Sequence, residues 1–400
     1  MLDLSKHPYL KYILFGDIYS ANGLQGALGI TLLIVYFTEK DISIATTTIV
    51  AGIASIPFTL KFLFGPLTDH FIKKGRKPFV IIGGMIAGVM LFPLAFIDPT
   101  EALLPFTISL FIAVIGIVML DVAADAWAIQ ITKIHERGKI NAAMFGSLFG
   151  SMAIGIIFLS LIAKYYSYNM AYIVGGFFII LTMILPLLVK EEIKIVKRPK
   201  IRKMLILEFK KKNTILISIF GFISAMNFGI LLFVIPEYMM NFLNLDVGQI
   251  GFINSLFPIG VVSGAVTGGI MADRWGRKKT LAIFLIGSII FSLLLITANT
   301  WMILAIIYPI IGFLQGGATF SSLMALFMDI TNPKIGATQY SVLTSIANFG
   351  DYSIGIISGT LVLMLGYDRF FLYAAWVVGP ALLFLYFIKE IKDEKKKINT

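Results

Sequence analysis

The chain has 400 residues, of which 58% are hydrophobic and only 14% are charged, and it contains no cysteine. Soluble globular proteins are typically about 45–50% apolar and about 25% charged, so this composition excludes an ordinary soluble domain. The lack of cysteine excludes disulfides, thiolate zinc sites and cysteine nucleophiles. The net charge of +11 does not require a nucleic acid partner, because contact with anionic lipids accounts for it.

Apolar stretches of about 20 residues, the length that crosses the hydrocarbon core of a bilayer, follow one another along the chain. We predict six membrane helices, a polar break and six more. The fold class is then an all-α membrane protein of two pseudo-symmetric six-helix bundles. The predicted spans are residues 11–37, 44–64, 78–97, 102–128, 139–163, 169–189, 214–240, 248–271, 279–298, 301–328, 337–364 and 370–389.

Lysine and arginine are distributed unevenly between the two sides of these spans. If the N-terminus is cytoplasmic, all but four of the 33 basic side chains lie on the inner side; the exceptions are Lys40, Lys61, Lys164 and Arg369. Basic residues concentrate on the cytoplasmic side of membrane proteins. We therefore predict a multi-pass protein of the cell membrane with both termini in the cytoplasm.

Residues 190–213 form the only long connection between spans, and they are rich in basic residues with apolar residues between them. This linker divides the chain into an N-terminal bundle at 1–189 and a C-terminal bundle with a short basic tail at 214–400. Two interpretations of the linker stay open. It is either an amphipathic stretch lying on the anionic inner surface of the membrane or a solvated tether between the halves.

A short loop sequence occurs twice, about two hundred residues apart, which indicates two related halves. Each copy lies between two spans and contains two glycines, an aspartate, an arginine and a lysine, and the second copy adds a further arginine. The residues are Gly65, Asp69, Gly75, Arg76 and Lys77 in the first copy, and Gly269, Asp273, Arg274, Gly276, Arg277 and Lys278 in the second.

The second copy resembles the loop signature of the major facilitator superfamily, Gly-x-Leu-Ala-Asp-Arg-x-Gly-Arg-Lys. The resemblance implies that fold for the whole chain and implies that the loops latch the outward-facing state. The aspartates can accept charge-assisted hydrogen bonds that form in one arrangement of the bundle and break in another. The other interpretation is a surface ion pair, which contributes about 0–1 kcal/mol.

Features of the N-terminal half narrow the resemblance. Lys61 precedes the first loop copy, and the fourth span ends in Asp121-x-x-x-Asp125-Ala-Trp. These features are similar to the branch that contains muropeptide permeases, acetyl-coenzyme A transporters and folate–biopterin transporters. The fifth span lacks the Gly-Pro motif that drug antiporters of the superfamily usually carry. We interpret its glycines Gly146 and Gly150 as positions of close helix packing.

Ionisable groups inside membrane spans are costly and are usually functional. We predict an intramembrane charge network of five residues: Asp17, Lys61, Asp121, Asp125 and Asp351. Asp121 and Asp125 share one helical face because they are four residues apart. We expect Asp17 and Lys61 to join them near the cytoplasmic gate, since the family fold places the first, second and fourth helices together. A gating network, true proton carriers and a permanent structural network all remain open.

Polar residues near the middle of several spans outline a possible substrate path. In the family fold the first, fourth, seventh and tenth helices line the central cavity. The candidate cavity residues are therefore Asn22, Gln25, Asn227 and Gln315, with Asn348 of the eleventh helix beside them. For each residue alone, hydrogen bonding between helices is an equally good interpretation.

We therefore expect a secondary active transporter, not an enzyme, that works by alternating access and is coupled to H+. It would import a small amphipathic or anionic metabolite, without any cofactor or metal. No Gly-x4-Gly-Lys-Ser/Thr phosphate loop is present, which argues against an ATP-driven pump. The alternatives are a multidrug or hydrophobic-compound exporter and, more remotely, a non-transporting sensor. We expect a monomer whose partners are its small-molecule substrate and anionic inner-leaflet lipids, with no nucleic acid.

Overall fold

The computed structural model describes residues 9–65, 75–132, 137–191, 201–332 and 335–389, and within these ranges the regular elements are helices. The first half contains α1 (Leu10–Gly26), η1 (Ala27–Leu32), α2 (Leu33–Glu39), α3 (Ile44–Thr59), η2 (Lys61–Leu63), α5 (Lys77–Val89), η4 (Pro93–Ala95), α6 (Leu103–Ile131), α7 (Arg137–Tyr165), α8 (Tyr168–Leu181) and α9 (Ile184–Leu188). A short helix, α10 (Ile201–Phe209), precedes the second half. The second half contains α11 (Lys212–Leu232), α12 (Ile235–Asn241), α13 (Val247–Trp275), α14 (Arg277–Leu294), η6 (Leu295–Thr297), α15 (Trp301–Gln315), η7 (Gly316–Leu323), α16 (Met324–Ile330), α17 (Gly336–Trp376) and α18 (Gly379–Phe387).

Eleven helical stretches of the described residues are long and apolar enough to cross a membrane. Ten of them correspond to the first ten predicted spans, with ends that agree within a few residues. The last stretch, Thr338–Phe387, has 50 residues, and Gly366 interrupts it with a φ of 72°. Fifty helical residues would extend about 75 Å, far beyond a hydrocarbon core of about 30 Å. The break at Gly366 therefore favours two crossings here, as the predicted spans 337–364 and 370–389 require.

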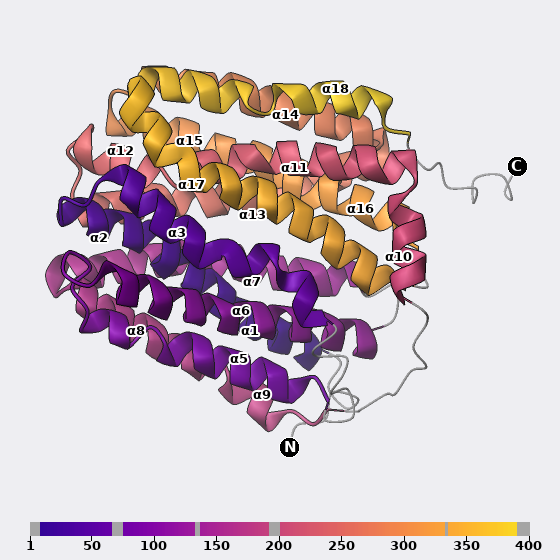
Figure 1. Cartoon of the computed structure of the whole chain (residues 1–400), viewed down its shortest axis with the longest axis horizontal. Coiled ribbons are helices and arrows are strands. Elements are labelled where there is room, and N and C mark those ends of the chain that lie inside the picture. The colour runs from indigo at the N-terminus through magenta and orange to yellow at the C-terminus, as the bar shows by residue number, and fades with distance from the viewer. Residues whose placement is uncertain (1–8, 66–74, 133–136, 192–200, 333–334, 390–400) are drawn as a thin grey trace, which may run out of the picture.

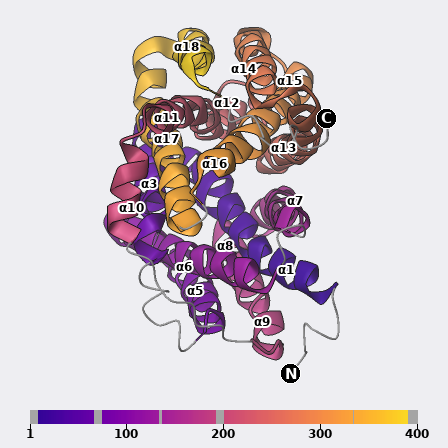
Figure 2. The ribbon, with the colours of Figure 1, turned by 90° about the vertical axis from the view of Figure 1, so that its right-hand side faces the viewer.

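The two halves lie side by side with their helices running in roughly the same direction (Figure 1). They meet mainly along two helix pairs, since α3 of the first half packs against α17 and α7 packs against α13, and α2 also contacts α12. The helix α10 lies at one end of this bundle, and α2 and α12 lie at the other (Figure 1). We call these the α10 end and the far end. Figure 2 looks at the molecule from the α10 end.

Four helices that start at the far end carry polar caps, whereas two that start at the α10 end follow a glycine. Side-chain oxygens accept backbone N–H groups in the first turns of α3, α8, α13 and α15; the caps are Ser43, Ser167, Asp246 and Thr300. Each cap satisfies an N–H group that the helix leaves unpaired. At the α10 end, Gly75 and Gly276 stand just before α5 and α14 with φ of 84° and 92°. Only glycine adopts such angles without strain.

Glycines also allow the close approach of α1 to α7, and the glycine with the tightest contact, Gly23, is on α1. A Cβ atom on Gly23 would lie 2.0 Å from the carbonyl oxygen of Leu148. Cβ atoms built on Gly146 and Gly150 of α7 would meet nothing within 4 Å. The prediction of tight packing at Gly146 and Gly150 is therefore wrong, because the spacing of two glycines does not reveal which face of the helix carries the contact.

Candidate functional site

Three helices of the first half bring charged and phenolic side chains together inside the bundle. Lys61 Nζ lies 3.2 Å from Oδ2 of Asp121, and the hydroxyl of Tyr19 donates to Oδ1 of Asp125 at 2.5 Å. Asp121 and Asp125 follow each other by one turn on α6, so they face the same side. We call Tyr19, Lys61, Asp121 and Asp125 the charge cluster.

The position of Lys61 follows from a change in helix type at the end of α3. Pro57 lies inside α3 and has no N–H to donate, and α3 ends two residues later at Thr59. The chain then continues as the single 3-10 turn η2, which starts at Lys61. This turn points the lysine towards α6 rather than along the lipid-facing side of α3.

Burial makes the ion pair of the charge cluster different from a surface salt bridge. The side chains of Lys61 and Asp121 are 15% and 6% exposed, and Tyr19 is 3% exposed. Charges in the bilayer core are tolerated when they pair with each other. The turn η2, which carries Lys61, packs against α17 of the other half. The charge cluster therefore lies where the two halves meet.

Two of the predicted network residues do not join this cluster. Among the described residues, no hydrogen bond or ion pair connects Asp17 or Asp351 to it. Asp17 is two residues from Tyr19 and so points to a different side of α1. Asp351 packs against Gly229 of α11, so closely that a Cβ atom on Gly229 would lie 2.3 Å from Oδ1 of Asp351. This buried oxygen has no hydrogen-bond partner within the described part of the chain.

The predicted cavity residues Asn227 and Gln315 bind each other. Gln315 Nε2 donates to Oδ1 of Asn227 at 2.6 Å, and the hydroxyl of Ser288 donates to the same oxygen at 2.6 Å. Asn227 Nδ2 donates to the carbonyl of Ala374 at 3.2 Å. Asn227 and Gln315 are 1% and 3% exposed. These bonds join α11, α14, α15 and α17, so both residues here connect helices.

The other three candidates differ from this pair. Asn348 on α17 donates to the carbonyl of Phe58 on α3 at 3.2 Å, which is a contact between the halves. Gln25 is 3% exposed, and neither end of its side-chain amide has a hydrogen-bond partner in the described structure. Asn22 is half-buried on the same helix. Buried side-chain amides nearly always form hydrogen bonds. Gln25 is therefore the candidate whose hydrogen bonds a bound molecule would supply.

The two loop copies form the same contact in both halves. Lys77 Nζ donates to the carbonyls of Leu187 and Val189 at the C-terminal end of α9, each at 2.8 Å. Its counterpart Lys278 donates to the carbonyls of Tyr386 and Ile388 at the C-terminal end of α18, at 3.1 and 2.7 Å. Each lysine thus caps the C-terminal end of the last helix of its own half, where carbonyls lack helical partners.

The remaining loop residues form contacts within their own halves or lie outside the description. The backbone N–H groups of Arg76 and Lys77 donate to Glu191, while Arg277 pairs with Asp329 at 3.4 Å. Gly65 is half-buried, Gly269 lies near Ser321, and Arg274 is exposed. Asp69 and the side chain of Asp273 lie outside the described structure, so the contacts expected of the two aspartates are not visible.

Polar contacts between the halves gather towards the far end. The contacts are Lys164 Nζ to Asp246 Oδ1 (3.0 Å), Asn254 Nδ2 to Thr31 Oγ1 (2.7 Å), Thr48 Oγ1 to the carbonyl of Ile356 (3.2 Å) and Gly359 N–H to Thr48 Oγ1 (3.2 Å). Among the described residues, the hydrogen bond of Asn348 is the polar contact between the halves that lies nearest the α10 end. Polar contacts therefore join the two halves at the far end.

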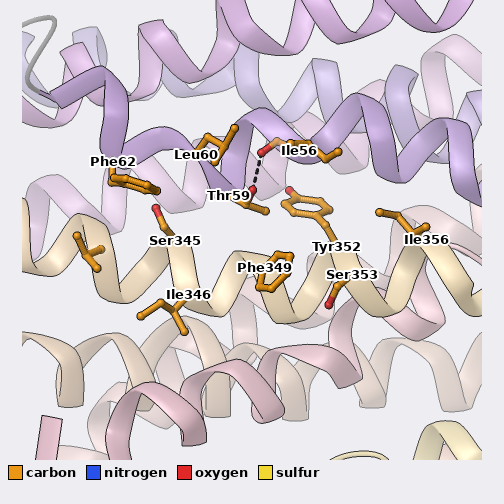
Figure 3. A pocket seen from close by; sticks show the side chains of 11 residues that line it. Ile56, Thr59, Leu60, Phe62, Ser345, Ile346, Phe349, Tyr352, Ser353 and Ile356 are labelled. Carbon is orange, nitrogen blue, oxygen red and sulfur yellow. Dashed lines mark hydrogen bonds between the residues drawn. The ribbon is translucent and has the colours of Figure 1, made fainter. Parts of the chain in front are cut away.

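A cavity of about 440 Å³ lies between α3 and α17. Its walls are mainly apolar, with Ile56, Leu60 and Phe62 on one side and Ile346, Phe349 and Ile356 on the other (Figure 3). Thr59, Tyr352 and two serines add hydroxyl groups. None of the five predicted cavity residues lines it.

The chain forms two joined helical bundles with the same loop contact in each half, and buried charges lie beside the contact between the bundles. This architecture is typical of membrane transporters. The chain belongs to the major facilitator superfamily, because the family model for the Major Facilitator Superfamily matches residues 18–223 and 217–400. It is accordingly a multi-pass membrane transporter of a small solute and not an enzyme.

Sequence and structure comparisons agree with this assignment. The chain is 23% identical to the anhydromuropeptide permease of Escherichia coli (strain K12), covering 91% of this chain and 77% of that protein. It is 27% identical to the putative transporter AmpG 4 of Rickettsia conorii, covering 92% and 94%. The fold matches a D-xylose–proton symporter (TM-score 0.75, 14% identity, 96% and 97% covered) and the nucleoside transporter NupG (0.78, 16%, 95% and 100%).

Sequence reasoning placed three members of the charge cluster and missed the fourth, Tyr19. Tyrosines make up 15 residues of the chain, and nothing local distinguishes this one. Tyr19 lies four residues after Phe15, on the face of α1 that packs on Trp127 of α6, and only the structure shows that contact.

Proposed function

We propose that this chain is a proton-coupled secondary transporter that imports a small amphipathic or anionic metabolite by alternating access. The buried charge cluster carries the proposal, since its ionisable side chains are shielded from water and lie beside the contact between the halves. A change in the protonation of Asp125 or Asp121 would alter the link from α6 to α1 or to η2. Hydrogen bonds to an ionised group are about twice as strong as neutral ones, so protonation would loosen that link.

The proposed orientation places the α10 end in the cytoplasm, with both termini on that side. The basic residues of α10 and of both loop copies lie at this end, and positive charge marks the cytoplasmic side. We propose that the polar contacts at the far end close it, so that the substrate site is reached from the cytoplasm in this arrangement. A single chain contains both halves, and we propose that the monomer is the working unit.

The substrate class rests on the relatives. The permease of Escherichia coli is named for anhydromuropeptides, and the chain matches 91% of its own length to that protein. We propose an amphipathic solute with a polar, anionic part. On the described helices, we expect Gln25, whose side-chain amide has no partner there, to bind the polar part of the solute.

Transport in proteoliposomes tests the coupling. Uptake of a candidate muropeptide should accelerate when an inward-directed pH gradient is imposed, and Asp125→Asn and Asp121→Asn should remove most of that acceleration. Asp351→Asn belongs in the same series, because this acid is buried but separate from the cluster. Gradient-driven uptake that is unchanged in the Asp121 and Asp125 variants would exclude both acids as required proton carriers. Efflux of hydrophobic compounds without muropeptide uptake would favour the exporter.

We also propose that the duplicated loops latch the outward-facing state through Asp69 and Asp273. The capping contacts of Lys77 and Lys278 support this, since they fix the loop next to helix ends in both halves. Asp273→Asn should shift the protein towards the arrangement open at the α10 end. Distances between spin labels on the two halves would measure the shift, and an unchanged distribution in both Asp69→Asn and Asp273→Asn would contradict the latch.

A further inference from the structure

We propose that the groove between α3 and α17 binds one acyl chain of an anionic phospholipid whose headgroup is bound by Arg202 and Lys203 of α10. The α3–α17 groove is the 440 Å³ cavity described above. This site is separate from the charge cluster and does not depend on which solute is transported.

The groove faces the side of the bundle that lipid must cover. α3 and α17 run beside each other across the face turned to the viewer in Figure 1. Leu60, Phe62 and Phe349 line the groove and are still 40%, 36% and 56% exposed. In a bilayer these apolar side chains contact hydrocarbon.

The length of the groove suits an acyl chain. Its lining on α17 runs from Val342 to Ile356, which at 1.5 Å per residue is about 21 Å along the helix. One leaflet contributes about half of a hydrocarbon core of about 30 Å. A chain that enters from the α10 end would therefore remain in the groove through its own leaflet.

Contacts within the second half place α10 beside the mouth of the groove. Glu208 of α10 accepts from Nδ2 of Asn332 at 2.8 Å, and the N–H of Asn332 donates to Oε1 of Gln339 at 2.9 Å. Gln339 is one turn before Val342, where the groove begins. Figure 2 shows α10 on the same side of the molecule as α3 and α17.

The exposed face of α10 has the composition of a helix that lies at a lipid surface. Arg202 and Lys203 are exposed on it, and one turn further on Ile206 and Leu207 are 49% and 54% exposed. Apolar residues next to basic ones suit the boundary between headgroups and acyl chains. Basic side chains there attract anionic lipid.

The one acidic residue of α10, Glu208, does not neutralise the positive charge of Arg202 and Lys203. Glu208 is 6% exposed and is bonded to Lys211 at 2.5 Å as well as to Asn332. Burial raises the pKa of Glu208, but the hydrogen bonds from Lys211 and Asn332 lower it below its ordinary value overall. The negative charge is thus held on the buried side of α10, and the lipid-facing side is basic.

Quenching by brominated lipids can test the site, because the chain has no cysteine and a single label is unambiguous. Ser353→Cys places a bimane label in the groove. As the control, Ile154→Cys places a label on the exposed surface of α7. Ile154 is as many residues from the start of α7 as Ser353 is from the start of α17. The full chain is reconstituted in vesicles that contain either brominated phosphatidylglycerol or brominated phosphatidylcholine at the same fraction.

We expect phosphatidylglycerol to quench the groove label preferentially and the Ile154→Cys label without preference. The preference should fall about fivefold for each basic side chain removed in Arg202→Gln and Lys203→Gln. Lys279→Gln, which removes another exposed lysine at the α10 end, should leave it unchanged. A second label at Ser345→Cys repeats the test if the first variant is unstable. Equal quenching by both lipids in the groove, no quenching there, or a preference insensitive to Arg202 and Lys203 would overturn the proposal.

Discussion

Lysine forms two very different ion pairs in the first half of this chain. Lys61 binds Asp121 inside the bundle, with the side chains 15% and 6% exposed. Lys40 binds Asp98 at 2.7 Å on the surface, with the side chains 39% and 37% exposed. Hydrogen bonds from Lys40 and Thr100 lower the pKa of Asp98 to about 2, so this surface pair is fully charged at neutral pH. The two pairs share their chemistry and differ in burial.

This difference predicts how the two lysines respond to replacement. Lys61→Met leaves Asp121 buried without a partner, which typically costs about 3–5 kcal/mol. Lys40→Met removes an exposed pair that contributes about 0–1 kcal/mol. Thermal unfolding in detergent should therefore show a large loss of stability for Lys61→Met only, and adding Asp121→Asn should restore part of it. A double variant less stable than Lys61→Met would contradict the pairing.

Glycine supplies a second comparison at the residue scale. Gly23→Ala would bring a Cβ to 2.0 Å from the carbonyl of Leu148 and should separate α1 from α7. Gly146→Ala meets open space and should stabilise its helix by about 1 kcal/mol, because alanine is the better helix former. Expression and thermal stability of the two variants measure this, and equal behaviour would show that the close approach is unimportant.

Individual charged residues were easier to predict than their partners. Asp121, Asp125 and Lys61 are conspicuous in an apolar sequence, and the structure brings them together. Asn227 and Gln315 were just as conspicuous, but their mutual bond and the role of Ser288 depend on how three helices pack. Hydrophobic patterns give the length of a membrane helix and little about its rotation, because lipid and packed helices favour the same side chains.

At the scale of elements, the sequence predicted ten of the spans closely and the last two less directly. The apolar pattern separates 337–364 from 370–389, whereas the structure has one long element with a break at Gly366. Breaks inside spans were not predicted, since π-helical segments such as η1 and η7 keep the same apolar character as the α-helices beside them. Such π-helical segments are recognised from their backbone hydrogen bonds, and they often accompany functional sites.

The lysine caps are the element-scale feature most open to test. Lys77→Met and Lys278→Met each leave two carbonyls without a charged donor at the end of α9 and α18. Each should reduce stability by about 1–3 kcal/mol, because the lost bonds involve a charged group. Hydrogen exchange should increase at the ends of those helices. Lys279→Met is the control, and exchange that rises equally in it would argue against specific capping.

At the scale of the whole molecule, the far end is held by few polar contacts, and one of them is exposed. Burial raises the pKa of Asp246, but hydrogen bonds from Lys164 and from the N–H groups of Gln249 and Gly248 lower it below its ordinary value overall. The stabilisation from this carboxylate is therefore present above the ordinary pKa of aspartate and disappears as the pH falls through the lowered value.

This predicts a closure that is insensitive to pH across the neutral range. Asp246→Asn should open the far end modestly, by up to about fivefold in population, because an exposed pair contributes about 1 kcal/mol at most. Accessibility of a cysteine introduced at Ile250, which is buried one turn after Asp246, to a membrane-impermeant reagent measures the opening. A steep dependence of the wild-type accessibility between pH 6 and pH 8 (about one unit either side of neutrality) would mean that other groups control this end.

The contact of Thr48 with Gly359 has a consequence for how this chain can evolve. The hydroxyl of Thr48 donates to one backbone carbonyl of α17 and accepts from one backbone N–H, and a Cβ on Gly359 would lie 2.3 Å from the carbonyl of Ile44. On the α17 side, the atoms that bond to Thr48 are therefore main-chain atoms, which do not depend on the side chain. Mutation at surrounding positions can accumulate without changing it, as long as a small hydroxyl residue and a glycine are kept. A lineage built this way can change its solute-binding residues while it keeps the same contact between the halves.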